Sequence, residues 1–337
     1  MAERWCSIVY YPYLRGKQFE LLALKEMAER SDLGSLVCPV VEPVRPPESG
    51  GLGRAFAEFH RQGIPSIIIV NPSVGPLSGS MDGTSDIIKF LEDSENGIGT
   101  VGAGVIVDSD TNIEEILSFI RARRGPNLLI SLFHKNYNDR IPELVKSEKL
   151  SSISGNFAES RDIVRLYDRV LLEDPTKNRE WRKIPFIRWK DHFPRMDKNV
   201  QYVGRSEQLF SADNVYMNDD GYAGISDFQT VGNYFQEGGG LPWAVAIHLT
   251  YQKDDDGPVY ISHFTSHSND DASDTAGKFA EALHDLVEFV DLNKLVNPAI
   301  EAFRTHNANG TYPGLGSLKK ISIQNHVYVM QSAMDLK

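Results

Sequence analysis

The sequence predicts an α/β protein of the TIM-barrel-like (β/α)8 class, and three observations carry this prediction. Short apolar segments alternate with amphipathic helical stretches through the first half of the chain, as expected for parallel strands buried on both faces. A polar residue directly follows most of these segments. With 337 residues, the chain is long enough for one barrel of about 250 residues plus additions.

The first half supplies most of the predicted βα units. Its first helix is marked by Leu21, Leu24 and Met27 at helical spacing, which predicts an amphipathic helix over residues 19–30. The predicted strands are 7–11, 36–41, 66–70, 101–107, 128–132, 151–154 and 169–172. The predicted helices between them are 19–30, 52–62, 84–91, 112–123, 141–148 and 158–166.

The second half reads as additions to a single barrel-like domain of residues 1–337. Residues 175–220 are polar, aromatic and irregular, long enough for a functional excursion over the barrel mouth. Residues 244–266 alternate around an Asp256-Gly257 turn, which predicts an inserted antiparallel hairpin. Residues 273–332 read as a C-terminal helical part. The eighth strand is 222–227 or 244–248.

Composition narrows the function classes. The formal net charge of −11 argues against a general nucleic-acid coat protein, since Lys and Arg carry nonspecific binding. Residues 177–198 hold eight Lys or Arg interleaved with aromatic residues, which suits either a stacking surface for bases or a packed loop. No apolar run approaches the roughly 20 residues of a membrane span and no secretion signal is evident, so we expect a cytoplasmic protein without a membrane partner.

The polar residues that follow the predicted strands indicate a site. Because the C-terminal ends of parallel strands converge at one end of a barrel, we expect these residues to form a ring there. They are Glu42, Asn71, Asp108, His134, Asn156 and Glu173.

The segment after the first strand is a candidate anion site. Gly16 permits a turn, and Arg15 and Lys17 stand at the start of a helix, where backbone amides attract anions. We expect Arg15, Lys17 and Gln18, with Asn71 and Asn156, to contact a phosphate-containing ligand. The competing interpretation is that Arg15 pairs with Glu42 or Glu20 within the loop layer.

The acidic residues at strand ends suggest metal-assisted chemistry. Glu42, Asp108 and Asp227 could hold Mg²⁺ or Mn²⁺ and polarise a phosphoryl oxygen, and His134 could act as general acid or base. The predicted catalytic residues are therefore Glu42, Asp108, His134 and Asp227. The alternative is a structural network in which Glu42 pairs with Arg15 or Lys135, and no dense metal-binding motif occurs at these positions.

His248 and His263 lie on the two predicted hairpin strands. Imidazoles that face each other across a strand pair could bind zinc or a phosphate. Histidines on partly buried strands more often bond a neighbouring carbonyl or carboxylate.

Several stretches together resemble a known family. They are Tyr-Tyr-Pro-Tyr-Leu-Arg-Gly-Lys-Gln-Phe-Glu at 10–20, Val-Val-Glu-Pro-Val at 40–44, Gly-Ile-Ser-Asp-Phe-Gln-Thr at 224–230, Ala-Val-Ala-Ile-His-Leu-Thr-Tyr at 244–251, His-Phe-Thr-Ser at 263–266 and Gly-Lys-Phe-Ala-Glu-Ala-Leu at 277–283. In this order and spacing, the chain resembles the "beta protein" family of bacteria and phages over nearly its whole length. The resemblance implies a barrel-like protein encoded beside a restriction-nuclease-like partner, with a role in phage defence. It supplies no catalytic residue set.

Three functions follow. The first is a defence-system subunit whose barrel carries an anion- or metal-binding pocket and binds or regulates a partner nuclease. The second is a stand-alone metal-dependent hydrolase of phosphate esters or nucleic acid. The third is an inert phage-related binding protein whose acidic surface mimics nucleic acid.

Overall fold

The computed structural model describes residues 9–47, 51–93, 101–124, 128–147, 153–205, 207–238 and 240–335. The described residues group into two compact units. The first contains the chain up to Lys190 together with Met217–Asp227, and the second contains Asp191–Tyr216 and the chain from Phe228 onward. The sequence predicts one barrel-like domain with additions. Of these additions, Asp191–Tyr216 and the chain from Phe228 onward belong to the second unit, which has its own sheet and core.

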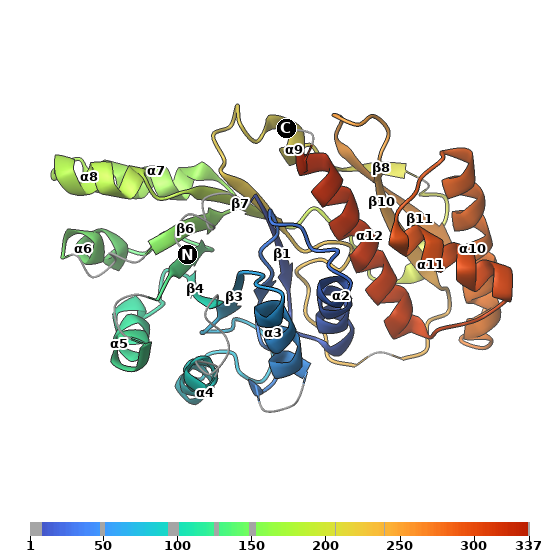
Figure 1. The fold of residues 1–337 in the computed structure, drawn as a ribbon, viewed down its shortest axis with the longest axis horizontal. Coiled ribbons are helices and arrows are strands. Elements are labelled where there is room, and N and C mark those ends of the chain that lie inside the picture. The colour runs from blue at the N-terminus through green and yellow to red at the C-terminus, as the bar shows by residue number, and fades with distance from the viewer. Residues whose placement is uncertain are drawn as a thin grey trace. The chain divides into compact units, whose positions relative to one another are not determined.

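The first unit is a closed barrel of eight parallel strands in the order β1-β2-β3-β4-β5-β6-β7-β9, which confirms the predicted fold class. The strands are β1 (Tyr10–Leu14), β2 (Val40–Val41), β3 (Ser66–Ile69), β4 (Val101–Val107), β5 (Ile130–His134), β6 (Ile153–Ala158), β7 (Phe186–Lys190) and β9 (Gly224–Asp227). The helices are α2 (Gln18–Glu29), α3 (Gly51–Arg61), α4 (Met81–Asp93), α5 (Ile113–Arg124), α6 (Arg140–Lys146), α7 (Arg161–Leu171) and α8 (Pro175–Arg182), and they lie on the outside of the strands (Figure 1).

The predicted elements of this unit are confirmed with two corrections. Residues 169–172 are not a strand but the end of α7, because Tyr167 and Leu171 lie four residues apart and are buried on one helix face. Ser160 caps this helix by accepting a hydrogen bond from the Asp162 amide. The seventh barrel strand is instead β7, inside the segment predicted to be irregular.

The segment 175–220 is therefore not an irregular excursion. It contains α8, whose N-cap is Asp174, then β7, the 3₁₀ turn η3 (Asn199–Tyr202), β8 (Glu207–Ser211) and α9 (Asp213–Tyr216). The eighth barrel strand is β9, which pairs with both β1 and β7. Residues 7–8, 148 and 151–152 of the predicted elements lie outside the described residues.

The second unit is built on an antiparallel sheet in the order β10-β11-β8. Strands β10 (Ala246–Gln252) and β11 (Val259–Thr265) form the predicted hairpin, and β8 adds a third strand. Helices α10 (Thr275–Leu292), α11 (Pro298–Asn309) and α12 (Leu315–Asp335) confirm the predicted C-terminal helical part. Asp274 and Asn297 cap α10 and α11 through their side chains.

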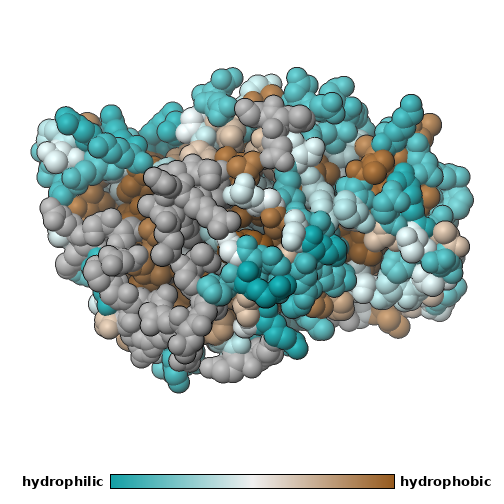
Figure 2. Space-filling view, viewed as in Figure 1, coloured by the Kyte–Doolittle hydropathy of each residue, from teal (hydrophilic) through white to brown (hydrophobic). Residues whose placement is uncertain are grey.

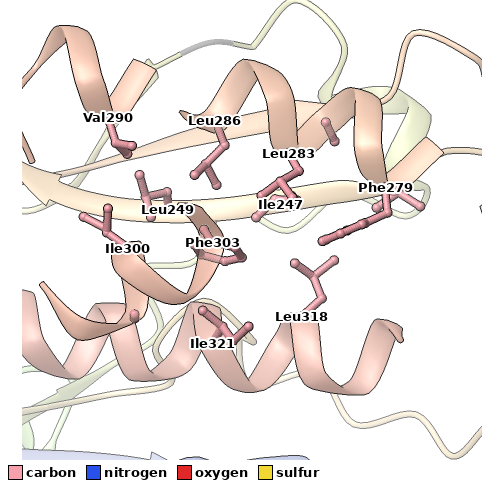
Figure 3. Close-up of a cluster of buried hydrophobic side chains, with 13 residues drawn as sticks. Ile247, Leu249, Phe279, Leu283, Leu286, Val290, Ile300, Phe303, Leu318 and Ile321 are labelled. Atoms are coloured by element: carbon pink, nitrogen blue, oxygen red, sulfur yellow. The ribbon is translucent and has the colours of Figure 1, made fainter. Parts of the chain in front are cut away.

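The core of the second unit lies between β10 and these helices. Ile247 and Leu249 point from alternate positions of β10 toward Phe279, Leu286 and other apolar residues of the helices (Figure 3). Figure 2 shows that hydrophilic residues cover much of the coloured surface on this face. No helix within the described ranges is long and apolar enough to cross a membrane.

Candidate functional site at the barrel mouth

Aromatic side chains fill the barrel interior. Tyr13 of β1 and Phe133 of β5 have ring centroids 5.7 Å apart although their strands are not neighbours in the barrel, so this contact crosses the interior. Phe133 stacks on Phe157 of β6 at 4.2 Å and meets Trp189 of β7 edge-on at 5.3 Å. The barrel is thus a packed core, and a ligand site belongs to its ends.

Because successive side chains of a strand point to opposite faces, the aromatic residues show which polar side chains point into the barrel. Residues aligned with Tyr13 and Phe133, or two positions along the same strand, point inward. Glu42 lies two residues beyond Val40, which is aligned with Tyr13. Lys135 lies two residues beyond Phe133. By this rule both side chains point inward. Both therefore belong to the C-terminal mouth of the barrel.

Glu42 is completely buried and is held by donors from three residues. The Tyr13 hydroxyl donates to Oε2 at 2.6 Å, and the Arg15 guanidinium forms an ion pair with the same oxygen. Ser73 donates to Oε1 from its backbone amide at 2.6 Å and from its hydroxyl at 2.9 Å. Burial raises the pKa of Tyr13 well above its usual value, so its hydroxyl stays a donor.

Arg15 contacts both carboxylates that the competing interpretation named, Glu42 and Glu20. Its guanidinium meets Glu42, and its backbone amide donates to the Glu20 carboxylate at 2.8 Å. Glu20, only 1% exposed, therefore occupies the region before α2 where an anion was expected. Lys17 is the N-cap residue of that helix, and Gln18 is exposed.

Lys135 lies beside this pair. Partial burial lowers the pKa of Lys135, the positive charge of Arg15 lowers it further, and Asp108 opposes the effect. Within the described ranges no carboxylate forms an ion pair or hydrogen bond with the Lys135 ammonium. The mouth thus holds two cations: Arg15 pairs with Glu42, whereas Lys135 has no carboxylate in contact within the described residues.

Asp108 is held by its own loop. Its Oδ1 accepts from the Asn136 amide at 2.8 Å and from the Ser109 backbone amide at 2.7 Å. These hydrogen bonds lower the pKa of the carboxyl, with Asn136 contributing most, and the nearby Lys135 lowers it further. Asp108 is therefore an ionised carboxylate at the mouth, with its charge turned toward loop donors.

Asn71 extends the barrel ladder beyond β3. Its amide nitrogen donates to the Ile106 carbonyl at 2.8 Å, and its side-chain oxygen accepts from the Ile106 amide at 2.8 Å. A side-chain amide that satisfies both groups of one backbone residue replaces a strand hydrogen-bonding pair. The structure thus gives Asn71 a scaffold role at the site where a ligand contact was predicted.

His134, Asn156 and Asp227 occupy the other alternation class and point away from the barrel interior. Asn156 Oδ1 lies 3.0 Å from His134 Nε2, and the Tyr167 hydroxyl of α7 lies 3.5 Å from His134 Nδ1. Asp227 accepts from the Tyr10 hydroxyl at 3.0 Å. Burial lowers the pKa of His134 to about 4, so this ring is neutral near pH 7.

The predicted site residues are therefore split between two layers. Glu42, Arg15 and Asp108, with Lys135, lie at the mouth, whereas His134, Asn156 and Asp227 face the helical layer. Glu173 does not follow a strand at all; it follows α7, is exposed and lies 3.9 Å from Lys146. Among the described residues no three His, Cys, Asp or Glu side chains are grouped to hold a metal, so Glu42, Asp108 and Asp227 do not form such a group.

Two parts of this site were not predicted from the sequence. Ser73 completes the donor set of Glu42, and its only signal is its position two residues after Asn71. Trp189 packs on Tyr13 with centroids 5.3 Å apart, and it was assigned to an irregular segment. Ile187 and Trp189 stand on either side of Arg188, and this alternation of apolar and charged residues is the signal that could have identified a strand.

Searches against models of known protein families and against curated proteins found no match to this chain.

Proposed function

We propose that the chain binds an anionic ligand at the barrel mouth and acts as a binding and regulatory subunit in phage defence. One observation carries the binding proposal: Arg15 is near enough for its positive charge to lower the pKa of Lys135, and within the described residues no carboxylate forms an ion pair or hydrogen bond with Lys135. Arg15 is buried and Lys135 is exposed, and an anion bound at Lys135 would relieve the repulsion between the two positive charges. A phosphate-containing ligand, including a nucleotide or a nucleic-acid end, supplies such a charge.

The contacts of the carboxylates favour binding over metal-dependent hydrolysis. Glu42 is saturated by donors, and Asp108 is held by Asn136 and Ser109. Asp227 points to the outer layer. No described contact gives the stand-alone phosphoesterase, with Mg²⁺ or Mn²⁺, or the inert binding protein comparable support.

The regulatory part of the proposal rests on the sequence resemblance. A family encoded beside a restriction-nuclease-like protein suggests a complex of the two chains. In this proposal, ligand occupancy at Lys135 and Arg15 changes the activity of the partner nuclease. The coupling is a difference in partner affinity between the free and the occupied barrel.

Calorimetric titration of the purified chain with inorganic phosphate, pyrophosphate and ATP tests the binding. We expect at least one of these to bind, and Lys135→Ala to weaken that binding about tenfold or more, as loss of a charge-assisted contact does. Lys89→Ala is the matched control, because Lys89 is an exposed lysine on α4. Equal affinities of the two variants, or no binding of any probe, would contradict the proposal.

Copurification tests the partner. The chain is coexpressed with the restriction-nuclease-like partner that the resemblance implies, and nuclease activity is measured with and without the ligand that titration identified. A stable complex whose activity responds to that ligand supports the regulatory role. Absence of a complex would remove the regulatory part and leave the binding site.

A further inference from the structure

The second unit contains a pocket that follows strand β11. Its volume is about 700 Å³, within the range of ligand-binding sites. The lining includes the five consecutive residues from Ser262 to Ser266, together with residues 202–205, Glu207 and two residues of α10. All lining residues belong to the second unit, and none belongs to the barrel.

The run of consecutive lining residues places the pocket at the edge of the strand. Side chains of a strand alternate between the two faces of a sheet, so a pocket on one face touches every second residue. This pocket touches five residues in turn, and it therefore lies beside the backbone of β11. These residues are Ser262, His263, Phe264, Thr265 and Ser266.

Strand β8 covers only the first part of this edge. Its first residue, Glu207, pairs with Ser262, and no described residue pairs with β11 beyond that position on the β8 side. Gly204 has a φ of 75°, a left-handed conformation that an extended strand does not adopt. The Arg205 amide donates to the Tyr202 carbonyl at 3.0 Å. The chain therefore enters β8 from a turn, and β8 does not extend along the whole of β11.

The hydrogen bonds to β10 fix the direction of the Thr265 backbone. The Ser266 amide donates to the Val245 carbonyl at 2.9 Å, so it faces β10. Successive residues of an antiparallel pair turn their N–H and C=O groups to opposite sides, so those of Thr265 face away from β10 and toward the pocket. By the same alternation the Thr250 carbonyl of β10 faces away from β11, where it accepts from Asn325 at 2.8 Å.

The Thr265 backbone is thus an open position of the sheet. Its amide and carbonyl have no hydrogen-bond partner among the described residues, and the residue is only half-buried. A donor and an acceptor presented side by side at a strand edge are the template on which another strand pairs. The group that satisfies both is the backbone of an extended peptide.

The two faces beside this edge differ. On the helix side, Phe264 and Phe289 have ring centroids 5.3 Å apart, and both are half-buried. On the other side, the Tyr202 ring centroid lies 4.5 Å from that of His263. A strand added at the edge directs alternate side chains to these two faces, so its apolar residues can gather on the helix side.

The carboxylates of the lining already have basic partners. Glu207 accepts from Lys253 at 2.6 Å. Asp285 lies 2.9 Å from the His267 ring. The pocket therefore suits an uncharged segment better than a strongly basic one, because its acidic groups are engaged.

We propose that this pocket binds an extended, uncharged peptide segment of a partner protein, which continues the sheet beyond the start of β8. One peptide residue pairs with Thr265, accepting from its amide and donating to its carbonyl. The two neighbours of that residue turn their side chains toward Phe264 and Phe289, which favours apolar residues there. Backbone pairing supplies the affinity and the aromatic wall supplies the selectivity.

Calorimetric titration of the full chain with the capped pentapeptide acetyl-Thr-Leu-Thr-Leu-Thr-amide tests the proposal. We expect a Kd below about 1 mM and amide hydrogen exchange at Thr265 that is at least about tenfold slower in the complex. Methylation of the central threonine nitrogen removes the donor to the Thr265 carbonyl and should weaken binding at least about tenfold. Methylation of the first leucine nitrogen is the control, because that amide faces away from β11.

A protein variant tests the same pairing from the other side. Thr265→Pro removes the open amide, and β10 loses no hydrogen bond because that amide faces away from it. We expect it to weaken peptide binding about tenfold or more. Ala246→Pro is the matched control and should leave binding unchanged, since Ala246 lies opposite Thr265 and its amide faces the other edge of the sheet. Thermal unfolding checks that both variants are folded.

Several outcomes would overturn the proposal. They are no peptide binding at about 10 mM, equal effects of the two methylations, or equal peptide affinities of the folded Thr265→Pro and Ala246→Pro variants. A chain that is a dimer in sedimentation equilibrium, and that Thr265→Pro converts to a monomer, would place a second copy at this edge instead of a partner peptide. If Thr265→Pro does not fold, the two methylated peptides decide the question with the unaltered chain.

Discussion

The Arg15–Glu42 ion pair gives the sharpest test of the barrel mouth. Arg15→Ala would leave the completely buried Glu42 carboxylate with three neutral donors, from Tyr13 and Ser73. Removing one partner of a buried ion pair destabilises by about 3–5 kcal/mol. Because three hydrogen bonds remain, we expect the lower end, about 3 kcal/mol.

Urea unfolding followed by tryptophan fluorescence measures this loss, since Trp181 and Trp189 are buried in the first unit. Arg61→Ala is the control, because the Arg61–Glu58 pair has the same chemistry but Arg61 is 64% exposed. An exposed pair is worth about 0–1 kcal/mol, so the control should change the unfolding free energy by no more than that.

A double-mutant cycle separates the pair from its surroundings. Arg15→Ala and Glu42→Gln should be non-additive, with a coupling energy of about 1–3 kcal/mol, because the residues contact each other. Additive effects, or a loss from Arg15→Ala no larger than that of the Arg61→Ala control, would refute the view that this pair holds the mouth together.

Further predictions concern packing and pH. Gly104→Ala should destabilise by about 1–3 kcal/mol in urea unfolding, because its Cβ would lie 2.5 Å from an Ile69 methyl group. Gly53→Ala in α3 should instead stabilise by about 0.5–1 kcal/mol, since its Cβ meets nothing closer than 3.7 Å; equal signs would contradict the packing. Leu249→Ala, in the completely buried core of the second unit, should destabilise by about 2–5 kcal/mol in the same assay. His134 has its folded-state pKa lowered from 6.5 to about 4, so the unfolded chain binds more protons between these values and stability falls as pH falls through that window. The full effect is about 3 kcal/mol; His134→Gln should remove it from the difference between unfolding at pH 7 and pH 4, and an unchanged difference would contradict a neutral buried ring.

Local sequence was sufficient for most secondary structure. Alternating apolar residues and turn residues predicted the β10–β11 hairpin, and cap residues such as Asp274 and Asn297 predicted the starts of α10 and α11. These features depend on contacts within a few residues of the chain. The strand predicted at 169–172 was wrong, because a short apolar run fits either a helix face or a buried strand. The strand at 186–190 lay in a segment predicted to be irregular, where Arg188 and Lys190 interrupt the apolar residues.

The candidate site was predicted only in part, for a geometric reason. Adjacent strand residues point to opposite faces, so His134 and Lys135, neighbours in sequence, belong to different layers of the barrel. The sequence pattern placed His134 in the site and named Lys135 only as a possible partner of Glu42, because it did not say which of the two neighbours faced inward.

Apolar periodicity by itself determined that this chain forms parallel βα units followed by a hairpin and helices. Tertiary structure alone decided that Arg15 pairs with Glu42, that Lys135 lies beside them, and that His263 meets His248 at the edge of a pocket. The physical reason is that strand and helix formation follows local periodicity, whereas these contacts depend on barrel closure and strand register, which join residues far apart in the chain.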